Sequence, residues 1–123
     1  MDRFVIVIPM LVSLLIGCKD QAQCEKERNE LYKTWGGLRA EATHRKLEGV
    51  DVPGWTDVEK KAETLESSFM TPSVTWDSAE KARQTIAAAL PDLHTDRPAL
   101  LTSFRSAVDS ASKQQAAFEK DCR

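Results

Sequence analysis

The sequence predicts an all-α fold, a small up-down four-helix bundle with long first and fourth helices and a short central helical hairpin. Beyond residue 20, apolar residues recur every three or four positions, and no alternating run predicts a strand. Gly49, Pro72 and Pro91 divide this pattern into four helical segments. Cys24 and Cys122 stand near opposite ends of the pattern, where antiparallel first and last helices would bring them together.

The first helix is expected from about residue 21 to residue 47, ending before Gly49. Its apolar positions share one face, and they are Cys24, Leu31, Trp35, Leu38 and Ala42. Gly36 and Gly37 fall inside this helix, where each glycine costs ~1 kcal/mol relative to alanine. We expect this pair to admit a closely packed helix or to break the helix in two, in preference to a hinge or a ligand contact.

Two short helices follow, each introduced by a capping-box pattern. The second is expected to begin at Thr56, with Glu59 completing its box. The third has its box at Asp77 and Glu80. Their apolar stripes recur at helical spacing, and they are Val58, Ala62, Leu65 and Phe69 in the second helix and Ala79, Ala82, Ile86 and Leu90 in the third.

The fourth helix is expected to be capped by Asp96, with Pro98 in its first turn. Its seam alternates steps of three and four, as in a coiled coil, through Leu101, Phe104, Val108, Ala111, Gln115, Phe118 and Cys122. The outer helices would be ~38 Å long and the inner two ~20 Å long. We therefore expect the cysteine end to be a bare two-helix stalk.

The first residues read as a targeting segment. Residues 4–16 form an uncharged, largely apolar run, which is shorter than the ~20 residues that a membrane-spanning helix needs. Such a run is typical of the hydrophobic region of a signal peptide. It ends in Leu15, Ile16, Gly17 and Cys18, and polar Lys19 follows at once. We therefore expect a signal peptide over residues 1–17, a lipidated tether over 18–23 and a helical bundle domain over 24–123.

This boundary resembles the lipobox of bacterial lipoproteins, in which an aliphatic residue and a small residue precede the cysteine. The resemblance implies transfer of diacylglycerol to the thiol of Cys18, cleavage after Gly17 and acylation of the new amino group, palmitate being an expected acyl group. It also implies a protein of the bacterial cell envelope, anchored to a membrane through lipid on Cys18. Lys19 after the cysteine resembles outer-membrane lipoproteins, so we expect an outer-membrane location facing the periplasm.

Once Cys18 is assigned to lipid, Cys24 and Cys122 remain of the three cysteines. In an oxidising compartment we expect these two thiols to form a disulfide. Closing a loop of ~100 residues would stabilise the fold by ~4 to 5 kcal/mol in the chain-entropy account. A zinc site is the alternative, but two cysteines without nearby histidines make a poor zinc ligand set.

The remaining polar residues suggest binding to a protein in preference to catalysis. The formal net charge is −2, with both signs interspersed, so we expect no nucleic-acid partner. No motif places a nucleophile near His44 or His94, and we expect neither an enzyme nor a cofactor. Asp92, His94 and Asp96 could ligate a metal, but turn formation and helix capping explain both acids, so we expect no metal site.

Two functions remain open. Several residues should gather at the membrane-distal end as a candidate partner surface, namely Val52, Pro53, Trp55, Leu93 and His94. We expect a structural or adaptor lipoprotein that binds another envelope protein. In its architecture alone it is similar to the pilotins of bacterial secretins, small helical lipoproteins that bind a secretin tail. The alternative is an inhibitor or immunity-type lipoprotein that blocks an enzyme or a toxin.

Overall fold

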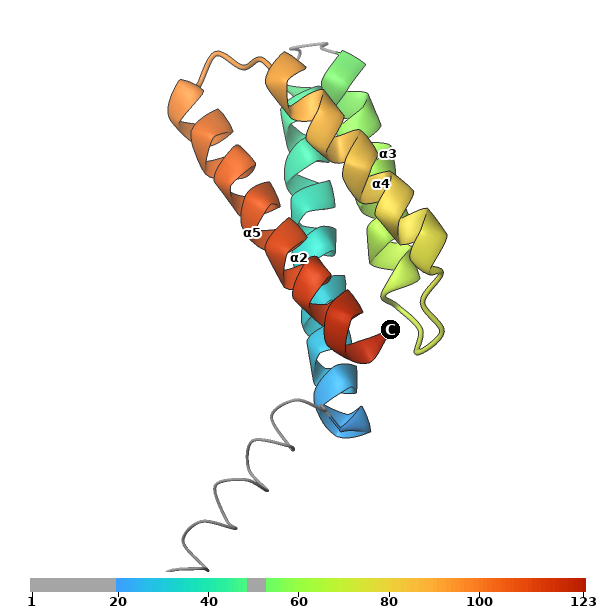
Figure 1. Ribbon diagram of the computed structural model, residues 1–123. Helices are drawn as coiled ribbons and strands as arrows, with labels where there is room; N and C mark the ends of the chain where they lie inside the picture. The colour runs from blue at the N-terminus through green and yellow to red at the C-terminus, as the bar shows by residue number, and fades with distance from the viewer. Residues whose placement is uncertain (1–19, 49–52) are drawn as a thin grey trace, which may run out of the picture.

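The computed structural model describes residues 20–48 and 53–123, which form an all-α bundle (Figure 1). Its elements are α2 (Gln21–Leu47), α3 (Pro53–Ser68), α4 (Trp76–Ala89), the short 3-10 helix η1 (Leu90–Asp92) and α5 (Pro98–Cys122). Long first and last helices enclose a shorter central hairpin, as predicted. Within the described ranges, every helix is too short or too polar to cross a membrane. The predicted signal peptide and Cys18 lie outside the described residues.

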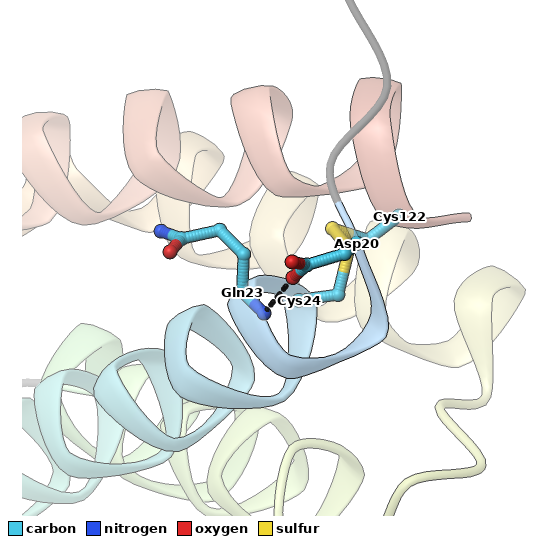
Figure 2. The surroundings of a disulfide bond; sticks show 4 residues. All are labelled: Asp20, Gln23, Cys24 and Cys122. Atoms are coloured by element: carbon cyan, nitrogen blue, oxygen red, sulfur yellow. Dashed lines mark hydrogen bonds between the residues drawn. A yellow bond between two sulfur atoms is a disulfide. The ribbon is translucent and has the colours of Figure 1, made fainter. Parts of the chain in front are cut away.

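The two long helices run antiparallel and are covalently joined at one end. A disulfide links Cys24, in the first turns of α2, to Cys122 at the end of α5, with their Cα atoms 5.7 Å apart (Figure 2). The predicted bridge is therefore confirmed. It joins residues 98 positions apart in the sequence, so it encloses almost the whole bundle.

Helix α2 spans Gln21–Leu47, as predicted for the first helix, so its first three residues belong to the expected tether. The side chain of Asp20 caps the helix, since its Oδ1 accepts a hydrogen bond from the backbone N–H of Gln23 at 2.7 Å (Figure 2). A capping aspartate satisfies one of the backbone donors that every helix start leaves unpaired. Residues 21–23 of the expected tether are therefore helical.

The glycine pair inside α2 admits a close neighbour and does not break the helix. The helix is continuous from Gln21 to Leu47. A Cβ atom at Gly36 would collide with the carboxylate of Glu66 on α3, whereas one at Gly37 would meet nothing within 4 Å. Beside Gly36, Arg39 Nε donates a hydrogen bond to Glu66 Oε1 at 2.8 Å. The expected close approach is confirmed at Gly36, and the expected break is wrong.

Helix α3 begins earlier than its capping-box pattern suggested. Its first residue is Pro53, three positions before Thr56. Proline suits the first turn of a helix, where its missing N–H would have no partner in any case. Glu59 does not complete a box but accepts a hydrogen bond from Lys46 Nζ at 2.6 Å. The predicted start at Thr56 is therefore wrong, and Glu59 joins α3 to α2.

The predicted capping box of α4 is also wrong. The helix begins at Trp76, and Thr75 at the N-cap position makes no side-chain capping bond. Asp77 therefore lies inside the first turn. The carboxylate of Glu80 forms a salt bridge with Arg83 on the same helix. An i,i+3 ion pair of this kind competes with the reciprocal bond that a capping box requires.

Helix α5 begins at Pro98, with Arg97 and not Asp96 at the N-cap position. Asp96 instead accepts a hydrogen bond from the hydroxyl of Thr95 at 3.4 Å. The same Thr95 hydroxyl accepts the backbone N–H of Arg97 at 3.2 Å. A short side-chain turn thus leads into α5 without capping by aspartate.

The predicted apolar stripes form one continuous core. The buried members are Leu31, Trp35, Leu38 and Ala42 of α2, Val58, Ala62 and Leu65 of α3, Phe69 after it, Ala79, Ala82 and Ile86 of α4, and Phe104, Val108, Ala111 and Phe118 of α5. Leu90 and Leu101 are partly buried at its edge. The helical period therefore predicts the buried face of each helix correctly.

The expected bare stalk is wrong, because the central hairpin reaches the disulfide end. Arg28 Nη1 donates a hydrogen bond to the carbonyl of Phe69 at 2.9 Å. The rings of Phe69 and Trp76 lie 5.8 and 5.6 Å from that of Phe118. With 16 residues, α3 is ~24 Å long, and the turn after it extends the hairpin further. Only the first turns of α2 project beyond the hairpin (Figure 1).

The core contains a polar side chain on the seam of α5. Gln115 has no exposed surface, and neither of its amide atoms has a hydrogen-bond partner among the described residues. The same holds for Trp35 Nε1 on α2. A buried polar group without a partner costs ~1 to 3 kcal/mol.

Replacing this amide by a hydrocarbon of similar size should stabilise the bundle. We expect Gln115→Leu to raise the free energy of unfolding by ~1 to 2 kcal/mol, because the cost of the unpaired amide is removed. Urea unfolding followed by circular dichroism measures the change. The matched control is Gln114→Leu, which alters a neighbouring half-buried glutamine. Destabilisation by Gln115→Leu would show that the buried amide is satisfied in solution.

Candidate functional site

Three side-chain hydrogen bonds fix the segment between α4 and α5 at the end of the bundle opposite the disulfide. Trp55 Nε1 donates to the carbonyl of His94 at 2.8 Å. Arg105 donates from Nε to the carbonyl of Leu90 and from Nη2 to that of Leu93, both at 3.2 Å. The last carbonyls of a helix have no partner within it. Side chains from α3 and α5 therefore satisfy this backbone and hold it in one conformation.

This geometry corrects the predicted partner surface. Trp55 and Leu93 are 1% and 0% exposed, so they belong to the core and not to a surface patch. The Trp55 ring lies 5.1 Å from that of Phe104, in an edge-to-face contact. Val52 lies outside the described residues, and Pro53 begins α3. Of the five predicted residues, only His94 is described as exposed.

Trp55 was predicted to lie on the exposed partner surface, but it is buried. Its ring and its N–H have different roles. The apolar ring extends the core, while the N–H reaches a backbone carbonyl at the edge. An apolar residue beside a turn can point into the core or toward solvent, and the sequence alone does not tell which. The role of Arg105 was not predicted either, because in the sequence it looks like an ordinary surface cation.

A shallow groove of about 520 Å³ lies beside the fixed segment, between the start of α3 and the end of α4. Both of these helix ends lie at the end of the bundle away from the C-terminus (Figure 1). We call this the distal groove, and it is lined by Gly54, Asp57, Thr85, Ala88, Ala89, Asp92 and His94. A Cβ atom at Gly54 would lie 3.0 Å from the Leu93 side chain. Glycine therefore lets α3 start close against the segment.

The rim of the distal groove carries acidic side chains, and small side chains line its walls. Asp57 and Asp92 are exposed, and neither forms an ion pair with any residue in the described ranges. The hydroxyl of Thr85 donates to the carbonyl of Lys81 at 3.0 Å. The groove can therefore contact small apolar groups and pair with a cation.

The three residues weighed as metal ligands do not assemble into a site. Over residues 20–48 and 53–123, no three histidine, cysteine or acidic side chains come together as metal ligands. Asp92 and His94 line the distal groove, whereas Asp96 bonds with Thr95. Turn formation therefore accounts for Asp96 here.

A second hollow, of about 320 Å³, lies at the disulfide end. It is enclosed by the first turns of α2, the turn between α3 and α4 and the end of α5, and it is lined by Gln21, Cys24, Glu25, Arg28, Pro72, Val74, Trp76, Phe118 and Cys122. Arg28 is only 7% exposed, and it holds the Phe69 carbonyl. The guanidinium of Arg123 lies 5.7 Å from the centre of the Trp76 ring.

A carboxyl group near this end, that of Glu119, has a raised pKa. Burial raises the pKa of Glu119, and the negative charge of Glu80 raises it further. The positive charges of Arg83 and Arg123 act in the opposite direction. Glu119 Oε1 is buried without a hydrogen-bond partner among the described residues. Its ionised form is therefore disfavoured in the folded protein.

Comparison with protein-family models, curated proteins and solved structures finds no match for this chain.

The raised pKa of Glu119 predicts a pH-dependent stability. Ionised Glu119 destabilises the fold above its folded pKa, and the penalty disappears below the ordinary value of 4.5. We therefore expect Glu119→Gln to be more stable than the unsubstituted chain at neutral pH, with the difference vanishing in acid. Thermal unfolding across pH measures it.

The control for this prediction is Glu59→Gln, which should behave in the opposite way. A hydrogen bond from Lys46 lowers the pKa of Glu59, so its ionised form stabilises the fold. That variant should lose stability at neutral pH, and the loss should shrink as pH falls through the folded pKa. Equal behaviour of the two variants would contradict the prediction.

Proposed function

We propose that this chain is a membrane-anchored lipoprotein of the bacterial envelope that acts as a structural or adaptor module by binding another envelope protein. The observation that carries the proposal is the disulfide between Cys24 and Cys122, because it accounts for two of the three cysteines. The third, Cys18, stands where the apolar run ends, two residues before the cap of α2. A structural disulfide is itself typical of proteins outside the cytoplasm.

The anchor in this proposal is lipid on Cys18. Each buried methylene contributes ~0.8 kcal/mol, so one acyl chain binds a membrane reversibly and two or more hold it firmly. A protein anchored in this way needs no spanning helix. Lys19 supports the outer membrane, facing the periplasm, as the proposed location.

The distal groove is the proposed binding site for the protein partner. Trp55 and Arg105 already fix the backbone beside it, so binding there orders little additional chain. The small side chain of Ala88 favours a segment with small apolar residues. Asp57 and Asp92, which form no ion pair within residues 20–48 and 53–123, favour lysine or arginine next to them. Charge complementarity of this kind supports specificity and rapid association.

The anchor is tested by intact mass spectrometry of the protein extracted from bacterial membranes. We expect a chain that starts at Cys18 and carries added acyl mass. Cys18→Ser should leave an unprocessed chain without that mass, while Cys24→Ser should still be acylated. A chain that retains Met1 and carries no acyl mass would contradict the proposed anchor.

The partner site is tested by chemical crosslinking in membranes, followed by affinity capture of the lipoprotein. We expect Ala88→Arg to reduce the yield of a specific crosslinked envelope protein about tenfold, which corresponds to a loss of ~1.4 kcal/mol in binding. The matched control is Ala116→Arg, which changes an exposed alanine of α5 that does not line the distal groove. Equal yields from the two variants would contradict this site. Capture of a toxin or of an exogenous enzyme would instead favour the inhibitor or immunity alternative.

A further inference from the structure

The proposed lipid attachment site lies very close to the folded domain. Asp20 caps α2, and Cys18 precedes it by two residues. Two residues of fully extended chain span at most ~7 Å. That reach is comparable to the thickness of one headgroup layer, ~5 to 7 Å. If Cys18 is acylated, as the proposed function requires, the first turn of α2 must lie at the membrane surface.

Apolar side chains lie near the start of α2 at the disulfide end of the bundle. Met70 is 57% exposed, in the turn between α3 and α4. Among the described residues, the other large exposed apolar side chain is Leu47, 75% exposed at the opposite end of α2. Pro72 and Val74 line the same hollow as Gln21. The turn therefore lies beside the helix start that the anchor would hold against the membrane.

Trp76 adds an aromatic side chain to this end. It is half-buried, with its ring packed against Phe118 and the guanidinium of Arg123 on its ring. Tryptophan is enriched at membrane interfaces, where its apolar ring and its polar N–H are both accommodated. Arginine beside it can extend its charged group toward headgroups while its stem covers apolar surface.

We propose that Met70, Pro72, Val74 and Trp76 form a membrane-seating surface that rests on the phospholipid bilayer once Cys18 is acylated. Because the first turns of α2 project beyond the hairpin (Figure 1), a slight tilt of the bundle toward the hairpin brings Met70 and Trp76 to the headgroups in this arrangement. The lipid on Cys18 keeps the surface at a high effective concentration near the bilayer, so weak apolar contacts are sufficient. The bundle then stands on its disulfide end instead of swinging on a loose tether.

Apolar contact, and not charge, is the source of this adhesion. Charges of both signs lie beside the surface, and they include Glu25, which lines the same hollow, Asp77 and Arg123. Arg123 Nη2 already lies 3.8 Å from Asp77 Oδ1. A mixed cluster of this kind gains little from anionic lipid, unlike a polybasic segment. Seating is therefore expected to be insensitive to salt and to the fraction of anionic lipid.

Seating would also fix the height of the distal groove. Helix α2 has 27 residues and so is ~40 Å long. Because the groove lies at the far end of the bundle, an upright bundle presents it ~40 Å from the bilayer surface (Figure 1). A partner segment would then be bound at that height and not at the headgroups.

The test uses the acylated full-length protein in vesicles of phosphatidylethanolamine and phosphatidylglycerol whose acyl chains are brominated near the headgroup. Bromine quenches tryptophan fluorescence at short range. Trp35 and Trp55 are buried in the core, so quenching should come from Trp76. We expect Trp76→Phe to lose most of the quenching, and Met70→Asp to weaken it. The matched control is Leu47→Asp, which changes the exposed apolar side chain at the far end and should quench like the unsubstituted chain.

The outcomes separate this proposal from the function on which it rests. Quenching that depends on Trp76 and Met70, and that persists in high salt, supports the membrane-seating surface. A chain that is acylated and bound to vesicles but shows no quenching, or equal quenching in Met70→Asp and Leu47→Asp, overturns the surface and leaves the anchor intact. A chain that carries no acyl mass and does not bind vesicles overturns the anchor and the surface together.

Discussion

The antiparallel pairing of α2 and α5, closed by the disulfide between Cys24 and Cys122, is the constraint on which the rest of the structure depends. A domain of about 100 residues has a modest core, so a cross-link that removes entropy from the unfolded chain matters. Closing a loop of this length contributes ~4 to 5 kcal/mol in the chain-entropy account. That is comparable to the lower end of the net stability of small domains, ~5 kcal/mol. The central hairpin packs on this pair of helices, whose register the disulfide fixes in the oxidised protein.

Each end of the central hairpin is held by an arginine from a long helix. At the disulfide end, Arg28 of α2 bonds the carbonyl of Phe69, where α3 gives way to the turn. At the distal end, Arg105 of α5 bonds two carbonyls of the segment after α4. In both places the guanidinium supplies an additional donor to carbonyls at a helix end. The long helices therefore contribute polar contacts as well as apolar ones, and the two candidate surfaces lie beside these rigid contacts.

The sequence predicts the helices and their buried faces well, because burial along a helix imposes a period that even a single sequence displays. It predicts the disulfide because antiparallel first and last helices bring Cys24 and Cys122 together, and two cysteines without nearby histidines make a poor zinc ligand set. It fails at helix starts, since an Asp or Glu near an end can pair with a side chain as readily as it can cap. Glu59 and Glu80 both do so. It also fails at Trp55, because only the three-dimensional structure places the His94 carbonyl within reach of the indole.

Gln115 is a buried polar residue that could help to specify the register of α2 against α5, a role that the disulfide takes over once it forms. In coiled coils, a single buried amide can specify register at a cost in stability. Gln115 occupies such a seam position, seven residues before Cys122 on the same face of α5. After oxidation the covalent bond sets the register of α2 against α5, so the amide is no longer needed to specify that register. Before oxidation, packing alone must bring the two thiols together. A polar residue that disfavours other registers would act at that stage, and its cost would persist in the finished fold.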